Sequence, residues 1–177
     1  MGKKASFAVA LAILALPATA LPLEAFNRIT VFNAVRDAAE ARKSCGVNPA
    51  KIAQAIDAFR VILDLYPDAG YCAYSWNEIG ELYLLLKDWP HAIGAFERVL
   101  DRFPRSDYSD DALRRILQHA RQTDDWDRAA RAIEKFVSQR PAHPSCDNLL
   151  LELARVYQRR GDLTRAAGAL ERLVNSY

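Results

Sequence analysis

The pattern of apolar and polar positions along this 177-residue chain repeats every 37 residues. Residues 88–104 read DWPHAIGAFERVLDRFP, and residues 125–141 read DWDRAARAIEKFVSQRP. Related segments stand one period earlier, at 51–67, and one period later, at 162–177. A fixed period of about 20–50 residues is typical of repeat architectures, in which each unit packs on its neighbours. The sequence therefore predicts four copies of one structural unit.

Each unit divides into two amphipathic helices. In residues 88–104 the apolar side chains recur at helical spacing, with Asp88 placed to cap the helix and Pro104 placed to end it. The preceding segment, 74–88, has its own helical stripe and contains Gly80, which indicates a close helix crossing because Gly otherwise weakens a helix. We expect helices at 24–44, 49–66, 71–87, 89–103, 108–122, 126–140, 146–160 and 163–176.

The motif positions of these units resemble the tetratricopeptide repeat (TPR). The second unit carries the family pattern W-x2-L-G-x2-Y…A-x3-F…P at Trp76, Ile79, Gly80, Tyr83, Ala92, Phe96 and Pro104. The resemblance covers about residues 36–177, with units at about 36–72, 73–109, 110–146 and 147–177. It implies an all-α fold, a right-handed TPR-like α-solenoid of about four helix pairs.

The turns between units, clearest in residues 103–108 (FPRSDY), look similar to the bacterial envelope branch of this family. That branch includes the outer-membrane β-barrel assembly lipoprotein and a Tol-Pal-associated periplasmic protein that coordinates cell division. That lipoprotein needs a cysteine near the start of its mature chain to carry the lipid, and the present chain departs from it because its first cysteine is Cys45.

The first twenty residues have the pattern of a secretory signal peptide. Lys3 and Lys4 precede an apolar run over residues 7–16, and the segment Ala18-Thr19-Ala20 supplies a cleavage signal. We expect cleavage after Ala20, which leaves residues 21–177 as a soluble exported or periplasmic protein with no stable membrane anchor. The mature protein then has 22 basic and 22 acidic residues, and this neutral balance gives no indication of nucleic-acid binding.

Motifs of enzymes and metal sites are not found in the sequence. The three histidines share no metal-ligand spacing, and the sequence contains no Gly-rich phosphate loop or nucleophile elbow. Cys72 and Cys146 stand two periods apart, too far for a disulfide if the units stack, so we expect no intramolecular disulfide. The sequence therefore predicts a non-enzymatic protein without a cofactor or metal.

The first helix of each unit is expected to line the concave side of the solenoid. Its positions away from the apolar stripe form the candidate partner-binding groove: Tyr74, Asn77, Glu81, Arg114, Gln118, Arg121, Asn148, Arg155 and Arg159. Four arginines on consecutive units predict a basic end that binds an acidic group or C-terminal carboxylate of a protein or peptide partner. Ordinary solvated helix faces are the alternative interpretation.

Two function classes stay open. The first is an exported adaptor that binds a partner protein or peptide on its concave face, in cell-envelope assembly or division. The second is a structural or homo-oligomerisation module, or a fragment of a longer TPR protein, that packs through its terminal helix. In that helix Leu170, Leu173 and Val174 are expected to be partly uncovered.

Overall fold

The computed structural model describes residues 23–67 and 70–175, with side chains from residue 33 onward in those ranges. This part of the chain contains eight helices and no strand: α2 (Leu23–Cys45), α3 (Pro49–Leu65), α4 (Tyr71–Leu85), α5 (Trp89–Arg102), α6 (Ser109–Gln122), α7 (Trp126–Gln139), α8 (Cys146–Arg159) and α9 (Leu163–Val174). All eight predicted helices are confirmed, and each end lies within two residues of its expected place. The predicted signal peptide, residues 1–20, lies outside the described residues.

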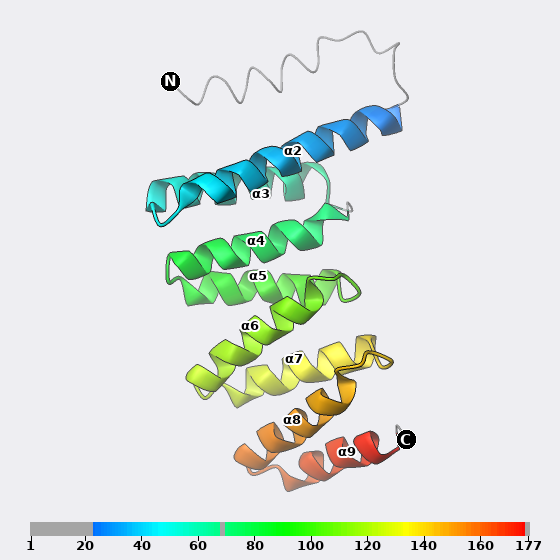
Figure 1. The fold of residues 1–177 in the computed structure, drawn as a ribbon. Coiled ribbons are helices and arrows are strands. Elements are labelled where there is room, and N and C mark those ends of the chain that lie inside the picture. The colour runs from blue at the N-terminus through cyan, green and yellow to red at the C-terminus, as the bar shows by residue number, and fades with distance from the viewer. Residues whose placement is uncertain (1–22, 68–69, 176–177) are drawn as a thin grey trace.

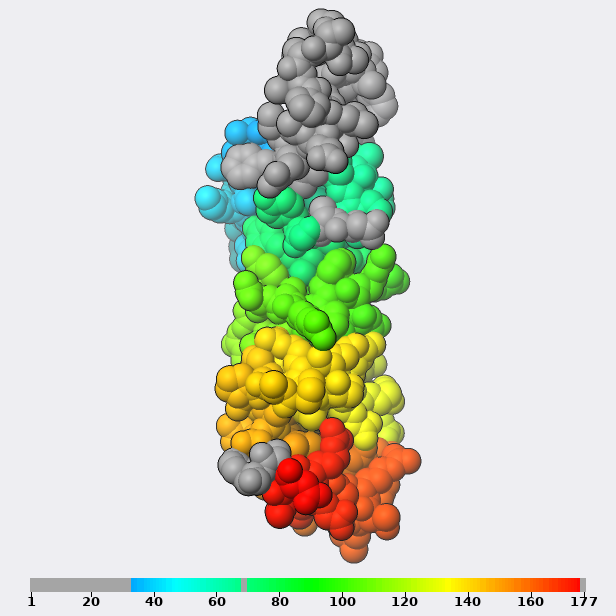
Figure 2. Space-filling view, turned by 90° about the vertical axis from the view of Figure 1, so that its right-hand side faces the viewer, coloured from blue at the N-terminus to red at the C-terminus, as the bar shows by residue number. Residues whose placement is uncertain are grey.

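The helices stack in chain order into an elongated column (Figures 1 and 2). Each helix packs mainly on the one before it and the one after it, while α2 with α4 and α5 with α7 make lighter contacts. The core is therefore built between neighbours in the sequence, as expected of a solenoid. No sheet or long-range pairing closes the described part of the column.

The second helix of every unit begins at a side-chain cap. Asn48, Asp88, Asp125 and Asp162 each stand at the N-cap, and each accepts a hydrogen bond from a backbone N–H in the first turn. These caps satisfy N–H groups that a helix start leaves unpaired.

The tight turn before three of these caps needs one residue with a positive φ. This residue is Lys87 (φ 59°), Asp124 (φ 53°) and Gly161 (φ 75°) in successive units. The same turn conformation therefore recurs at the 37-residue period, whichever residue type occupies the position.

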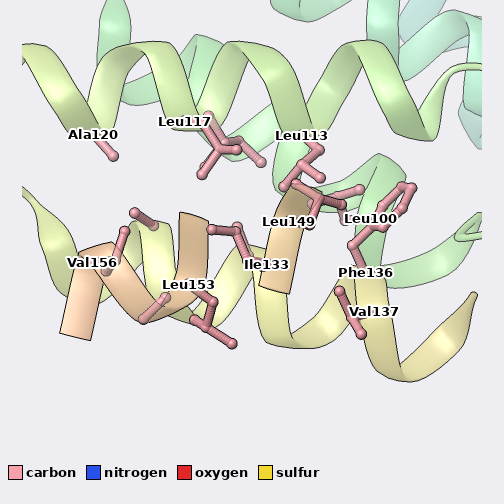
Figure 3. Close-up of a cluster of buried hydrophobic side chains, with 14 of the residues drawn as sticks. Leu100, Leu113, Leu117, Ala120, Ile133, Phe136, Val137, Leu149, Leu153 and Val156 are labelled. Carbon is pink, nitrogen blue, oxygen red and sulfur yellow. The ribbon is translucent and has the colours of Figure 1, made fainter. Parts of the chain in front are cut away.

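Helices α4 and α5 pack tightly at Gly80. A Cβ atom added there would lie 2.6 Å from Cε1 of Phe96, a fully buried ring. This contact confirms the close crossing that Gly80 predicts. Further along the column, side chains of three helices gather in one buried cluster, with Leu113 and Leu117 from α6, Ile133 and Phe136 from α7, and Leu149 from α8 (Figure 3).

The three cysteines are free and buried, so the expected absence of an intramolecular disulfide is confirmed. The thiols of Cys72 and Cys146 donate to the carbonyl oxygens of Tyr66 and Arg140, at 2.9 and 3.0 Å. Burial raises the pKa of the Cys146 thiol, which disfavours the thiolate and makes this cysteine a structural residue.

Candidate functional site

Ion pairs connect the first helices of successive units along one side of the column. Arg42 on α2 contacts Glu78 on α4 at 3.2 Å, and burial, more than the Arg42 charge, sets the pKa of Glu78 above its usual value. Glu81 on α4 holds Arg115 on α6 through two hydrogen bonds of 2.7 and 2.9 Å. Bidentate pairs of this kind fix geometry as well as charge. The first helices therefore form one continuous face.

A groove lies between α6 and α8 on this face, and we call it the α6–α8 groove. Its volume is about 250 Å³, and it is lined by Asp110, Leu113, Arg114, Leu117, Arg121, Phe136, Ser145, Leu149 and Glu152. The apolar members among these residues form the floor, and each is at most 8% exposed. Figure 3 shows Leu113 and Leu117 of α6 facing Leu149 of α8 across this region. The groove therefore offers an apolar floor between charged rims.

One end of the groove is crossed by an ion pair between Arg121 of α6 and Glu152 of α8. The Nε atom of Arg121 lies 3.2 Å from Oε1 of Glu152. Arg155 is exposed on α8, three residues after Glu152, and residues at this spacing share one face of a helix. This row of two arginines and one glutamate carries a net positive charge.

At the opposite end of the groove, Asp110 accepts contacts from two residues of the α7–α8 turn. Arg140 Nη1 lies 3.1 Å from Oδ1 of Asp110, and His143 Nε2 lies 3.2 Å from Oδ2. The guanidinium of Arg140 also stands over the Phe136 ring, 5.1 Å from its centroid. A single carboxylate therefore joins α6 to the turn that precedes α8 at this end.

The four predicted arginines do not form a simple basic end. Arg114 is paired with Asp111 within α6, Arg121 is paired with Glu152, and the guanidinium of Arg159 stands 4.9 Å from the centroid of the Trp126 ring. Only Arg114 and Arg121 line the groove, and three carboxylates, of Asp110, Asp111 and Glu152, line it or pair with these arginines. The expectation of four free arginines is therefore corrected: two of them, Arg114 and Arg121, are paired with carboxylates of the protein.

The remaining predicted residues divide between surface and interior. Gln118 and Asn148 are exposed on α6 and α8, whereas the Glu81 carboxylate is held by Arg115. Tyr74 is half-buried, with its ring 5.7 Å from that of Phe59 and 5.6 Å from that of Tyr108.

The expectation of a surface position for Asn77 is wrong, because this residue is only 7% exposed. Its Oδ1 atom is buried without a hydrogen-bond partner among the described residues. The side chain of Asn77 is short, so its amide group stays close to the backbone of α4 and does not extend into solvent.

Sequence reasoning missed the apolar floor and the acidic partner of Arg121. Leu113, Leu117 and Leu149 follow the core pattern of their helices, so the sequence does not reveal that they also floor a groove. A signal for the ion pairs does exist: opposite charges stand close to one period apart on first helices, as in Arg42 with Glu78 and Glu81 with Arg115.

The described residues contain no group of three His, Cys, Asp or Glu side chains able to hold a metal ion. Within the same part of the chain, no helix has the length and apolar character needed to cross a membrane.

The model of the tetratricopeptide repeat family matches residues 50–107 and 114–176. The chain belongs to the tetratricopeptide repeat family. TPR units generally mediate protein–protein interactions. Among curated proteins, none matches this TPR chain significantly.

Solved structures similar to this TPR chain include two crystal structures of MamA. One is 17% identical, with a TM-score of 0.44 over 71% of this chain and 68% of that one; the other is 15% identical, with a TM-score of 0.46 over 84% of each chain. A putative kinesin light chain of Podosopora anserina with nearly identical TPR-like repeats is 17% identical. Its TM-score is 0.46 over 80% of this chain and 74% of that one.

Proposed function

We propose that this TPR protein is a non-enzymatic exported adaptor that binds a partner protein through the α6–α8 groove. The observation that supports this proposal is the apolar floor of Leu113, Leu117, Phe136 and Leu149 at the base of an open groove of about 250 Å³. A concave apolar site flanked by a few polar groups is the usual form of a binding pocket. In this proposal an apolar side chain of the partner fills the groove.

The second part of the proposal concerns an acidic group or C-terminal carboxylate of the same partner. In the row of Arg121, Glu152 and Arg155, the first two residues line one end of the groove, and Arg155 is exposed three residues after Glu152 on α8. A partner carboxylate that approaches this row engages the exposed Arg155 and competes with Glu152 for Arg121. Charge-assisted contacts contribute about 1.5–3 kcal/mol when they are shielded from water, and much less when they are exposed.

We place this adaptor in the cell envelope, in assembly or division, on the basis of the signal-like pattern of residues 1–20 and the inter-unit turns that resemble the envelope branch. Sequencing of the mature N-terminus tests the export step. The expected first residue is Leu21, and a protein that retains Met1 in the cytoplasm argues against it.

The binding proposal is tested with charge variants that act in opposite directions. Crosslinking in the periplasm followed by mass spectrometry first identifies the partner of the wild-type protein, and its affinity is then measured with purified proteins. The double variant Arg121→Glu with Arg155→Glu is expected to abolish capture. Glu152→Gln is expected to strengthen it, because Arg121 loses its competing carboxylate.

A matched control is Arg102→Glu with Arg131→Glu, two exposed arginines on α5 and α7. This control is expected to bind like wild type. If Glu152→Gln weakens capture, or if the control weakens it as much as the groove variant, the groove is not the binding site.

A further inference from the structure

The place in the repeat that forms the α6–α8 groove is better covered one unit earlier. Each residue that lines the groove has a counterpart 37 residues before it, where α4, α5 and α6 pack together. Asp110 and Arg114 are exposed at the groove, whereas their counterparts Ala73 and Asn77 are 2% and 7% exposed. The earlier unit therefore shows what a filled version of this groove contains.

One difference between the two places is the residue that precedes each first helix. Tyr108 stands before α6, and its counterpart before α8 is Ser145. The half-buried ring of Tyr108 packs against the core and lies 5.6 Å from the ring of Tyr74 on α4. Ser145 carries only a hydroxymethyl group, so the α6–α8 interface lacks the aromatic ring that the α4–α6 interface has.

The backbone is nearly identical at these two positions. Tyr108 has φ −84° and ψ −10°, and Ser145 has φ −81° and ψ −7°; neither side chain makes a capping hydrogen bond. Backbone angles determine the direction in which a side chain leaves the chain and the rotamers open to it. Since Ser145 itself lines the groove, the groove occupies the space beside the missing ring.

The lining of the groove is suited to an aromatic ring. Leu113, Leu117 and Leu149 provide an apolar floor. At the rim, the side chain of Arg114 is 67% exposed although it is paired with Asp111. A guanidinium group over a ring is attracted by its π electrons, which an aliphatic side chain does not offer. This protein uses that contact inside its own fold, at distances between 4.9 and 5.4 Å, for Arg98 with Trp76, Arg140 with Phe136 and Arg159 with Trp126.

We propose that the partner residue held in the α6–α8 groove is aromatic, and that its ring lies beside Ser145 as the ring of Tyr108 lies in the preceding unit. This inference rests on the proposed function, which assigns the groove to a partner protein, and it adds the chemical class of the anchoring side chain. Pockets for drug-sized ligands have volumes of about 300–1,000 Å³, so a groove of about 250 Å³ admits one side chain. Tyr and Trp are enriched among the residues that dominate binding energy at protein interfaces.

The first experiment fills the groove from within the chain. Ser145→Tyr is expected to raise the midpoint of urea unfolding by a few tenths of a molar, because the new ring covers the apolar floor. Ser145→Leu is expected to raise it less, since a leucine side chain gains no attraction from Arg114. The matched control is Ser138→Tyr, at an exposed serine of α7 outside the groove, and it should leave the midpoint unchanged. Circular dichroism establishes that each variant is folded.

The second experiment uses two small probes, N-acetyl-tyrosine amide and N-acetyl-leucine amide. Each is titrated into the full chain, and the methyl resonances of Leu113 and Leu149 are followed by NMR. The tyrosine probe is expected to shift these resonances at lower concentration than the leucine probe. Arg114→Gln should weaken binding of the tyrosine probe about two- to fivefold, and Ser145→Tyr should remove the response because its own ring fills the groove.

Two results overturn the aromatic assignment. One is a Ser145→Tyr variant no more stable than Ser145→Leu, and the other is a leucine probe that binds as tightly as the tyrosine probe. A dimer in sedimentation that Ser145→Tyr dissolves also overturns the proposal, because the ring then comes from a second copy of the chain.

Capture of the crosslinked partner by Ser145→Tyr separates this inference from the proposed function, and capture is expected to be lost. If capture is lost but the probes show no aromatic preference, the groove remains the binding site and only the aromatic assignment fails. If Ser145→Tyr captures the partner like wild type, the proposed function fails, and this inference fails with it.

Discussion

The contact between Gly80 and Phe96 predicts how much the substitution Gly80→Ala lowers the free energy of unfolding. In Gly80→Ala the new methyl group would stand 2.6 Å from Cε1 and 2.7 Å from Cζ of the Phe96 ring. Carbon atoms in contact prefer a separation of about 3.5–4.0 Å. The ring is fully buried, so it has little free space to enter, and α4 and α5 have to move apart.

Two opposing effects determine the free energy of unfolding of Gly80→Ala. Forcing an extra methyl group into a packed core typically costs about 1–3 kcal/mol, and the 2.6 Å contact places this site in the upper half of that range. Replacing Gly by Ala within a helix gains about 1 kcal/mol. Gly80→Ala should therefore lower the free energy of unfolding by about 1–2 kcal/mol.

Gly94→Ala is the matched control, because Gly94 lies inside α5 and an added Cβ there meets nothing within 4 Å. In this variant only the helix propensity of the residue changes, so it should be more stable than wild type by up to about 1 kcal/mol. The two substitutions are chemically identical, yet they should shift stability in opposite directions. Urea unfolding followed by circular dichroism measures both.

A double variant tests the cause directly. One and two periods after Gly80 and Phe96, the chain has Leu117 with Ile133 and Ala154 with Leu170. Gly80→Ala with Phe96→Leu reproduces the fourth-unit pair, and it should be more stable than the sum of the two single losses implies. If Gly80→Ala is as stable as Gly94→Ala, or if the two losses simply add, the close contact does not control this crossing.

Two further predictions concern a turn and a buried acid. Lys87 has φ 59°, a conformation that favours Gly, so Lys87→Gly should raise the free energy of unfolding by about 0.5–1 kcal/mol; a destabilised variant in thermal melting would contradict this. Burial raises the pKa of Glu78, so its stabilising contribution is fully present below its unfolded pKa and is lost as pH rises through the folded value. The melting temperature of Glu78→Gln relative to wild type should therefore increase as pH rises from acid to neutral, and a flat difference would count against the burial argument.

The helices could be predicted from the sequence because their signals are local. Asp88 and Asp125 cap helices, Pro104 ends one, and the 37-residue period repeats these signals. Each signal acts within a few residues, so a linear pattern was sufficient. The crossing at Gly80 was also predictable, because a glycine inside a helix needs a packing reason.

The electrostatics of the site could not be predicted in the same way. Whether Arg121 is free or paired depends on Glu152, which lies on the next first helix, 31 residues later in the chain. Asn77 presented a related difficulty, since a polar residue beside an apolar stripe is expected on the surface, yet it is buried. Both errors concern three-dimensional surroundings, which the spacing of residues within one helix does not describe.

The stacking of each helix mainly on its neighbours has a mechanical consequence. Because no long-range pairing closes the described part of the column, small rotations at successive helix interfaces add up along its length. The column should therefore bend elastically, and a change in the distance between α6 and α8 has to stretch the Arg121–Glu152 ion pair. A ligand that contacts both helices would fix the distance between them. It would also reduce hydrogen exchange in units that it does not touch.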